Sequence, residues 1–106
     1  MSHPGQFENV TVVCKANVYF DGKVVSHTIL TPAGKKTLGL IYPGVYTFNT
    51  AAPEKMEIIA GWCRARLGPR DAWATYRQGD SFNVPAKSSF EISVDEGIAE
   101  HICTFE

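Results

Sequence analysis

The 106-residue sequence has no long apolar run and almost no net charge. Its apolar stretches fall far short of a bilayer span, and residues 1–15 lack the basic start and continuous apolar segment of a signal peptide. We therefore expect a cytoplasmic protein without a membrane partner. The formal net charge of -1, with 20% charged residues, indicates neither a disordered chain nor a polyanion-binding tail.

Cysteine and histidine are both scarce, and neither is spaced for metal binding. The cysteines are odd in number, widely separated and without a Cys-x-x-Cys pair, which argues against a disulfide framework or a zinc knuckle. We expect all three to be reduced and buried. No histidine has a carboxylate or cysteine at ligand spacing, so roles in a metal site or a catalytic triad are not expected. These residues are Cys14, Cys63, Cys103, His3, His27 and His101.

An extended helical period is also missing, whereas strand signals are frequent. Glycines and prolines divide the chain into short segments rich in Val, Ile, Thr, Phe and Tyr, as in sandwiches and barrels. Alternation along residues 45–50, 63–67 and 90–94 places every second side chain on one face. Residues 53–60 have some helical character but fit a strand at least as well. The sequence, 44% apolar, therefore predicts one all-β domain.

Two spaced signatures refine this prediction. Glu54 is followed after six residues by Gly61, and five residues separate Gly79 from Pro85. These spacings resemble the two motifs of the cupin β-barrel, which is a jelly-roll-like fold. A cupin-type barrel is therefore the predicted architecture.

The histidines with which cupins hold a metal are missing from both motifs. Their places fall on or beside Phe48 and Thr50 in the first motif and on Phe90 in the second. None of these side chains is a useful ligand for a divalent metal, and Glu54 alone cannot hold zinc or iron against water. The sequence predicts a retained barrel without a metal.

A longer pattern resembles one family of small cupins. It comprises residues 19–24, residues 44–56, Trp73 with Tyr76, and residues 79–85 with Ser88 and Phe90. Over about residues 19–105, the chain is similar to the small pyrimidine/purine nucleoside phosphorylases. The resemblance implies a homodimeric pentosyltransferase that uses inorganic phosphate as co-substrate, and no other cofactor. Such an enzyme cleaves nucleosides of both base classes into free base and (deoxy)ribose 1-phosphate.

The chain departs from the shortest members of that family at its start. Residues 1–18 form an N-terminal extension, for which an added edge strand is one interpretation, and residues 19–106 would form the cupin barrel. The extension leaves the position of the dimer contact open.

Glu54 is the candidate catalytic residue. In an apolar pocket the pKa of its carboxyl should rise, which suits a proton donor to the leaving base or a hydrogen-bond partner for ribose hydroxyls. A glutamate at the barrel rim that only caps a turn after Pro53 is an equally good interpretation of the spacing.

Phe48, Phe90 and Met56 are candidate substrate-binding residues, with Ile58 on the same alternation. They would line the space that a metal occupies in other cupins, where Phe48 and Phe90 flank a base without reading its edge. In a generic β-sandwich they would be packed core instead. Only the family resemblance favours the binding role.

A phosphate site is the remaining requirement, because phosphate must attack the anomeric carbon of an oxocarbenium-like sugar. The hydroxyls of Thr50 and Ser88 are the candidates, with Ser88 expected to face inward and Lys87 or Arg77 to add positive charge. Tyr76 is a candidate donor to the base or the sugar. These residue types are also common in turns and on solvated sheet faces.

Other functions have weaker support. Residues 34–37 end like a P-loop, but the earlier glycine is absent and Gly39 and Pro43 interrupt the stretch, so a turn or loop is predicted. Arg64 and Arg66 alternate with apolar residues as on a solvated strand face, so nucleic-acid binding is not expected.

A non-catalytic cupin that binds a small sugar or nucleotide is the alternative function. A metal-dependent cupin with unconventional ligands is disfavoured by the aromatic substitutions.

Overall fold

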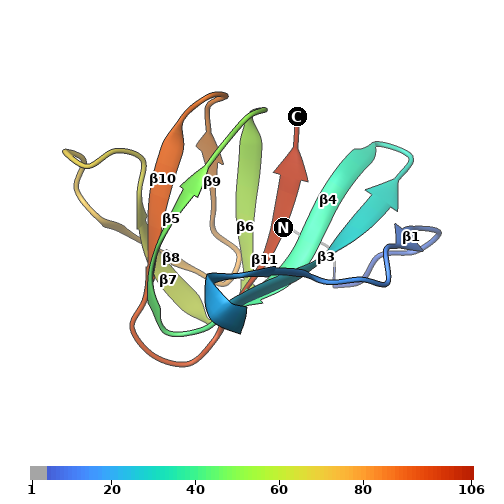
Figure 1. Ribbon diagram of the computed structural model, residues 1–106, viewed down its shortest axis with the longest axis horizontal. Helices are drawn as coiled ribbons and strands as arrows, with labels where there is room; N and C mark the ends of the chain where they lie inside the picture. Colours follow the sequence, from blue (N-terminus) through green and yellow to red (C-terminus); the bar gives the residue numbers. More distant parts are fainter. Residues whose placement is uncertain (1–4) are drawn as a thin grey trace.

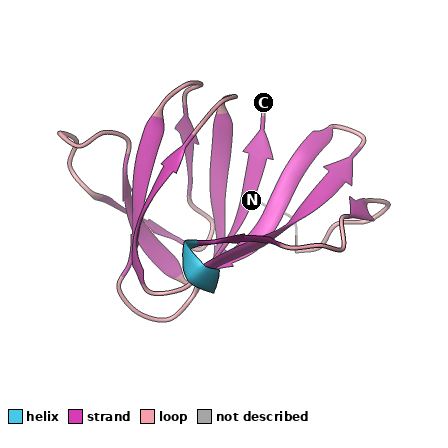
Figure 2. Ribbon diagram, in the orientation of Figure 1, coloured by secondary structure: helices cyan, strands magenta, loops and turns pink. Residues whose placement is uncertain are grey.

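Two antiparallel β-sheets face each other across an apolar interior (Figures 1 and 2). The computed structural model describes residues 5–106. Within this range the larger sheet comprises β1 (Thr11–Val12), β2 (Asn17–Tyr19), β3 (Val24–Thr31), β4 (Gly34–Ile41), β6 (Glu54–Ala60), β9 (Ser81–Val84) and β11 (Ala99–Phe105). The smaller sheet comprises β5 (Gly44–Asn49), β7 (Trp62–Arg66), β8 (Ala74–Arg77) and β10 (Ser89–Val94). The prediction of one all-β domain is confirmed.

The order of the strands places one open edge of each sheet near the other. The larger sheet runs β1-β3-β4-β11-β6-β9, with β2 also paired to β3, and the smaller sheet runs β5-β10-β7-β8. Strand β5 is thus an edge strand, and it faces β3 and β4 across the interior (Figure 1). A single 3-10 turn, η1 (Phe20–Gly22), is the only helical element within residues 5–106, and it lies at the lower end of this space.

The segments with clear alternation form the predicted strands. Residues 45–50 fall in and directly after β5, residues 63–67 in and directly after β7, and residues 90–94 in β10. The ambiguous segment 53–60 becomes β6, in agreement with its interpretation as a strand. Arg64 and Arg66 face away from the interior, where they pair with Asp95 and Glu91. The solvated face predicted for them is confirmed.

The prediction of a turn or loop at residues 34–37 is wrong, because these residues open strand β4. Gly34, at a φ of 134°, closes the short β3–β4 hairpin rather than interrupting a strand. Gly39 lies within the strand because there is no space for a side chain. A Cβ there would lie 2.4 Å from the carbonyl oxygen of Val25.

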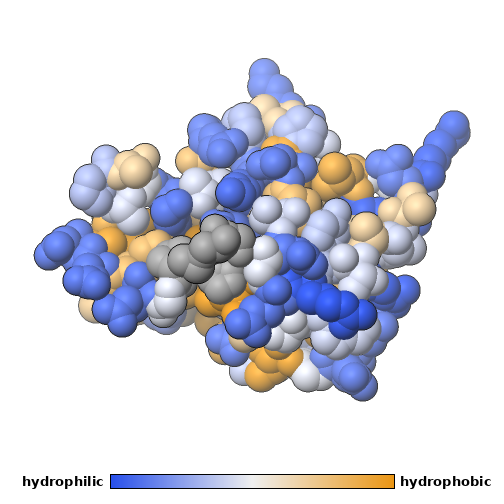
Figure 3. Space-filling view, turned by 180° about the vertical axis from the view of Figure 1, so that it is seen from behind, coloured by the Kyte–Doolittle hydropathy of each residue, from blue (hydrophilic) through white to orange (hydrophobic). Residues whose placement is uncertain are grey.

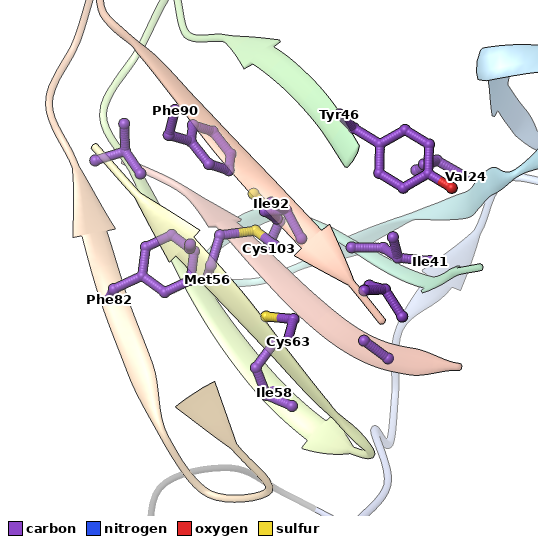
Figure 4. Close-up of a cluster of buried hydrophobic side chains, with 14 residues drawn as sticks. Val24, Ile41, Tyr46, Met56, Ile58, Cys63, Phe82, Phe90, Ile92 and Cys103 are labelled. Carbon is purple, nitrogen blue, oxygen red and sulfur yellow. The ribbon is translucent and has the colours of Figure 1, made fainter. Parts of the chain in front are cut away.

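The core forms where alternate residues of both sheets point inward. Figure 4 shows Met56, Ile58 and Cys63 beside Ile92, with Phe82 and Phe90 nearby. The largest fully buried side chains are Ile41, Ile58, Ile92, Val84 and Cys63. This cluster fills the part of the interior between β6 and the smaller sheet.

Two of the three cysteines are buried thiols, as predicted. Cys63 and Cys103 belong to inward-facing positions of β7 and β11. Cys14 is exposed, so the prediction is wrong for this residue. It lies in the connection between β1 and β2, which has no second layer to cover it. His3 lies outside the described residues.

Candidate active site

The interior is not completely filled by side chains. A cavity of about 690 Å³ lies between the inner face of β3, β4, β6 and β11 and the edge strand β5. This volume is within the range of small-molecule sites, roughly 300–1,000 Å³. The lining residues are Tyr19, Phe20, Val24, Ser26, Lys35, Thr37, Ile41, Thr47, Phe48, Asn49, Ala51, Ala52, Glu54, Met56, Phe90, His101, Cys103 and Phe105.

Strand register orders the inward-facing residues into rows across the larger sheet, because antiparallel partners lie side by side. Val24, Ile41 and Ala99 are buried and close one end. Next comes the row of Ser26, Gly39, His101 and Ile58, which we call the floor row. A third row contains Thr37, Cys103 and Met56. The last row, with Lys35, Phe105 and Glu54, we call the mouth row.

The mouth row combines a carboxylate and a cation. Glu54 accepts a hydrogen bond from Cys103, whose Sγ lies 3.4 Å from Oε1. Burial raises the pKa of Glu54, although the Cys103 hydrogen bond and the charge of Lys35 act in the opposite direction. The predicted rise is confirmed. The Lys35 ammonium lies 4.7 Å from the centre of the Phe105 ring. Within residues 5–106, Lys35 is the only Lys or Arg that lines the cavity.

Aromatic rings form one continuous wall of the cavity. The ring centroids of Phe48 and Phe90 are 5.3 Å apart and those of Phe20 and Phe48 are 5.5 Å apart. A base inserted between Phe48 and Phe90 would need about 7 Å, twice a contact spacing of about 3.5 Å. The two rings therefore do not flank a ligand as expected, because they already stack on each other. They offer a shared surface instead.

Backbone strain brings Phe20 to this wall. Phe20 and Asp21 have φ values of 53° and 56°, in the left-handed region that bulky residues rarely adopt. The resulting turn lays the Phe20 ring 4.9 Å from Tyr46 and beside Phe48, so that η1 bridges from the larger sheet to β5. Strain of this kind concentrates at ligand sites.

Three of the sequence-predicted substrate residues lie outside the cavity lining. Thr50 is buried and its hydroxyl donates to the carbonyl oxygen of Pro85 at 2.7 Å while accepting from the Ser88 amide at 2.9 Å. It thus ties the β9–β10 loop to the end of β5. Ser88 serves this loop through its backbone. Tyr76, on β8, packs on Phe82 with centroids 4.6 Å apart.

The remaining predicted residues are brought together. Phe48, Glu54, Met56 and Phe90 all line the cavity. Ile58, expected on the same face, does point inward but is fully buried in the core next to the cavity. The structure thus separates a compact group around Glu54 from the loop group around Thr50.

Comparison with known proteins identifies the family. A model of the family described as pyrimidine/purine nucleoside phosphorylase matches residues 14–105. A protein of this name from Cupriavidus necator is 57% identical over 101 residues, which cover 94% of this chain and 95% of the relative. Another from Burkholderia multivorans is 52% identical over 106 residues, with 99% of both chains covered. The chain belongs to the pyrimidine/purine nucleoside phosphorylase family.

Solved structures support the same fold for this family member. A protein of unknown function from an Acinetobacter species superposes with a TM-score of 0.90 at 45% identity, covering 95% of this chain and 98% of that one. An iron(II) form of HppE gives a TM-score of 0.73 at 12% identity, over 87% of this chain and 55% of the other. The latter likeness concerns the fold alone. The cupin-type architecture predicted from the motif spacing is confirmed.

The residues of this chain at the motif positions for cupin metal ligands are not a set of metal-binding side chains. Among residues 5–106, no group of three or more His, Cys, Asp or Glu side chains is arranged to hold a metal ion. Phe48, Glu54 and Phe90, the residues that the motif spacing aligns with cupin ligands, all line the cavity, and of the three only the Glu54 carboxylate is a metal donor. Within the same residues, no helix has the length and hydropathy needed to cross a membrane.

Most of the cavity lining is not predicted by the sequence pattern. Lys35 falls in a segment predicted as a turn or loop, His101 is predicted to have no metal or triad role, and the pattern predicts no role for Phe20 and Ser26. The alternation around Ser26 and His101 could have shown that they face inward. Their common position across Gly39 depends on pairing of β3, β4 and β11, which no local spacing reveals.

Proposed function

We propose that this protein cleaves pyrimidine and purine nucleosides with inorganic phosphate and releases the free base and (deoxy)ribose 1-phosphate. The supporting observation is the cavity of about 690 Å³, in which an aromatic wall faces a carboxyl of raised pKa. The family relatives carry the name pyrimidine/purine nucleoside phosphorylase. In this proposal phosphate is the co-substrate, and neither a metal nor another cofactor takes part.

The aromatic wall would hold the base. The rings of Phe20 and Phe48 meet edge to face, with their planes inclined by 80°. A base of either class would stack on the face of one ring, since every nucleobase has a π-face. Met56 packs on the opposite, sheet side of the cavity. Stacking of this kind contributes binding energy without selecting one base.

Glu54 would act where the glycosidic bond breaks. The C–N bond to the base breaks and a C–O bond to phosphate forms, so the departing base nitrogen must gain a proton or lose negative charge in another way. A carboxyl with a raised pKa is protonated in a larger fraction of molecules, which suits a donor to that base. In its ionised form the same group would accept hydrogen bonds from the ribose hydroxyls.

Lys35 would seat the phosphate. It is the single cation lining the cavity within residues 5–106, and it shares the mouth row with Glu54. The Thr50 hydroxyl, by contrast, already donates to Pro85 and accepts from Ser88. We therefore assign the phosphate site to the mouth row and not to the loop that contains Ser88. An ammonium at this position attracts the anion and stabilises charge on its oxygens.

Base release with and without phosphate tests this function. The protein is incubated with uridine or adenosine in phosphate buffer and in phosphate-free buffer, and free base and sugar phosphate are separated by chromatography. We expect base and an equal amount of sugar 1-phosphate only when phosphate is present. Release in neither buffer, or equal release in both, rejects phosphorolysis.

We also propose a homodimer. The outer face of the larger sheet carries a second, apolar depression whose lining includes Phe7, Leu38, Leu40 and Ile102. Leu38 is 37% exposed in the single chain, and the rear view contains hydrophobic areas among hydrophilic ones (Figure 3). Sedimentation velocity at several protein concentrations tests this proposal. A mass of one chain at all concentrations contradicts it.

A further inference from the structure

His101 is a buried polar side chain whose hydrogen-bonding capacity is not used by the protein. It is 6% exposed, lines the cavity, and its Nδ1 has no hydrogen-bond partner among the described residues. Buried nitrogens are nearly always paired, so an unpaired one needs an explanation. Because the ring lines the cavity, a ligand bound there can complete its hydrogen bonding.

No hydrogen bond from the described residues to Nδ1 fixes which ring nitrogen of His101 carries the proton. In most proteins a hydrogen bond to one ring nitrogen decides which nitrogen carries the proton. Burial lowers the pKa of His101 to about 4, so the ring is neutral at physiological pH and has one donor and one acceptor. Without a partner at Nδ1, a bound ligand can determine which nitrogen is the donor.

Ser26 lies in the floor row on the far side of Gly39 from His101, and its hydroxyl can also act as donor or acceptor. It is 6% exposed, and its Oγ accepts a hydrogen bond from the Asn17 amide at 3.3 Å. The hydroxyl proton can rotate toward the cavity, and a lone pair is still available there. Gly39 between Ser26 and His101 adds no side chain, so only backbone separates the two polar groups.

The floor row and the mouth row lie at opposite ends of the cavity, so they predict the orientation of a bound nucleoside. Four residues separate His101 from Phe105 along β11, which corresponds to roughly 13 Å at about 3.3 Å per residue. The neutral polar groups therefore lie near the closed end, and the only lining cation in the described chain, Lys35, lies at the mouth. An uncharged base fits the first environment and an anion fits the second.

We propose that His101 and Ser26 bind the hydrogen-bonding edge of the nucleobase, and that their interchangeable donor and acceptor roles allow the same pair to accept pyrimidines and purines. This inference rests on the proposed function and assigns the base-recognition site within it. Uracil presents an N–H between two carbonyls, whereas adenine presents a ring nitrogen beside an amino group. A histidine with a free tautomer and a serine with a free rotor can match both patterns.

Binding of uridine and adenosine, measured by calorimetry without phosphate, tests the site. We expect His101→Leu to weaken binding of both nucleosides by roughly 10- to 100-fold, since a base edge would lose its partner. His101→Gln keeps a donor and an acceptor and should stay within a few-fold of the wild type. Ser26→Ala should lose about 5- to 10-fold. His27→Gln, on the outer face of β3, is the matched control and should bind like the wild type.

The tautomer supplies a readout that a purely structural role would not change. Long-range proton–nitrogen NMR correlations of the wild-type protein distinguish the two neutral forms of His101. We expect different tautomers in the uridine and adenosine complexes. This measurement remains decisive if His101→Leu fails to fold.

The outcomes separate this inference from the proposed function. Normal phosphorolysis with unchanged affinity in His101→Leu and Ser26→Ala, and with one tautomer in both complexes, overturns the base-recognition site alone. Nucleoside binding without turnover rejects phosphorolysis, while the variant affinities still decide the role of His101 and Ser26. Absence of nucleoside binding in the wild type overturns both.

Discussion

The ring of Phe48 stacks on the ring of Phe90, with centroids 5.3 Å apart and planes inclined by 22°. Phe90 is buried and belongs to the core, whereas Phe48 also faces the cavity. The pair comes from neighbouring strands in direct register, so the stacking is a cross-strand contact on one face of the smaller sheet. The core therefore holds the binding wall in place.

Replacement of Phe48 by leucine should weaken nucleoside binding without much loss of stability. Aromatic contacts contribute about 0.5–1.5 kcal/mol beyond their buried area, which corresponds to a rise in the KM for nucleosides of roughly 3- to 10-fold. Uridine and adenosine should be affected alike, because stacking does not read the base edge. Val45→Ala, on the exposed face of the same strand, is the control. An unchanged KM in Phe48→Leu would remove this ring from the binding wall.

Lys35→Gln should raise the KM for phosphate by roughly 10- to 150-fold and leave the KM for nucleosides nearly unchanged. A hydrogen bond to a charged group contributes about 1.5–3 kcal/mol, and only the phosphate is an anion in the proposed reaction. Lys36→Gln is a closely matched control, since the neighbouring Lys36 points to the other face and donates to Thr104. Steady-state kinetics with phosphate as the varied substrate check the prediction. Equal effects of the two substitutions would exclude a specific role of Lys35.

Glu54→Gln should lower kcat by about 100-fold or more and change the melting temperature little. Glutamine keeps the carbonyl oxygen that accepts from Cys103 but cannot act as a carboxylic acid, and general acid catalysis contributes about 10²- to 10⁴-fold. Glu100→Gln, on the outer face of β11, serves as the control. Retained turnover in Glu54→Gln would assign the proton transfer to another group.

Thr50→Val should destabilise the protein by about 1–3 kcal/mol and leave the KM for phosphate unchanged. The valine has a similar shape but loses the hydrogen bonds to Pro85 and Ser88, and the half-buried amide of Ser88 loses its partner. Denaturant unfolding and kinetics together check this prediction. Thr75→Val, at an exposed position of β8, is the control. A stable variant with a greatly increased KM for phosphate would restore the original assignment of Thr50 to the phosphate site.

The sequence predicts the parts of the site that depend on local periodicity. Glu54 and Met56 alternate on one strand, and Phe48 lies in a segment of clear two-residue period, so their shared inward direction follows from strand geometry. The roles of Thr50 and His101 could not be read in this way. The Thr50 hydroxyl is occupied by a loop 35 residues further along the chain, and the environment of His101 is created by strands from three distant segments.

Gly34 and Gly39 have two different structural roles, which the sequence alone does not distinguish. Gly34 marks a turn, as glycines usually do, whereas Gly39 allows β3 and β4 to approach within a strand pair. The sequence pattern interprets both as signs of a loop, so it does not predict that Lys35 and Thr37 face the cavity. Steric fit between strands is a property of the assembled sheet, so the sequence pattern does not contain it.

The neutral state of His101 should make the protein less stable in mild acid. Its pKa is lowered from about 6.5 to about 4 by burial, so the unfolded chain binds more protons than the folded one between these values. Stability must therefore fall as the pH decreases through this window. Between pH 7.5 and pH 4.5 the loss from this residue is roughly 2–3 kcal/mol.

His101→Gln should remove that part of the pH dependence even if it lowers stability at pH 7.5. Urea unfolding at both pH values gives the difference for each protein. Its floor-row neighbours Ser26 and Ile58 carry no titratable group, and Glu54, Cys103 and Lys35 of the same cavity are present in both proteins. Their contributions therefore cancel in the comparison. An equal loss of stability in acid for the wild type and His101→Gln would show that the buried ring is not the group that resists protonation.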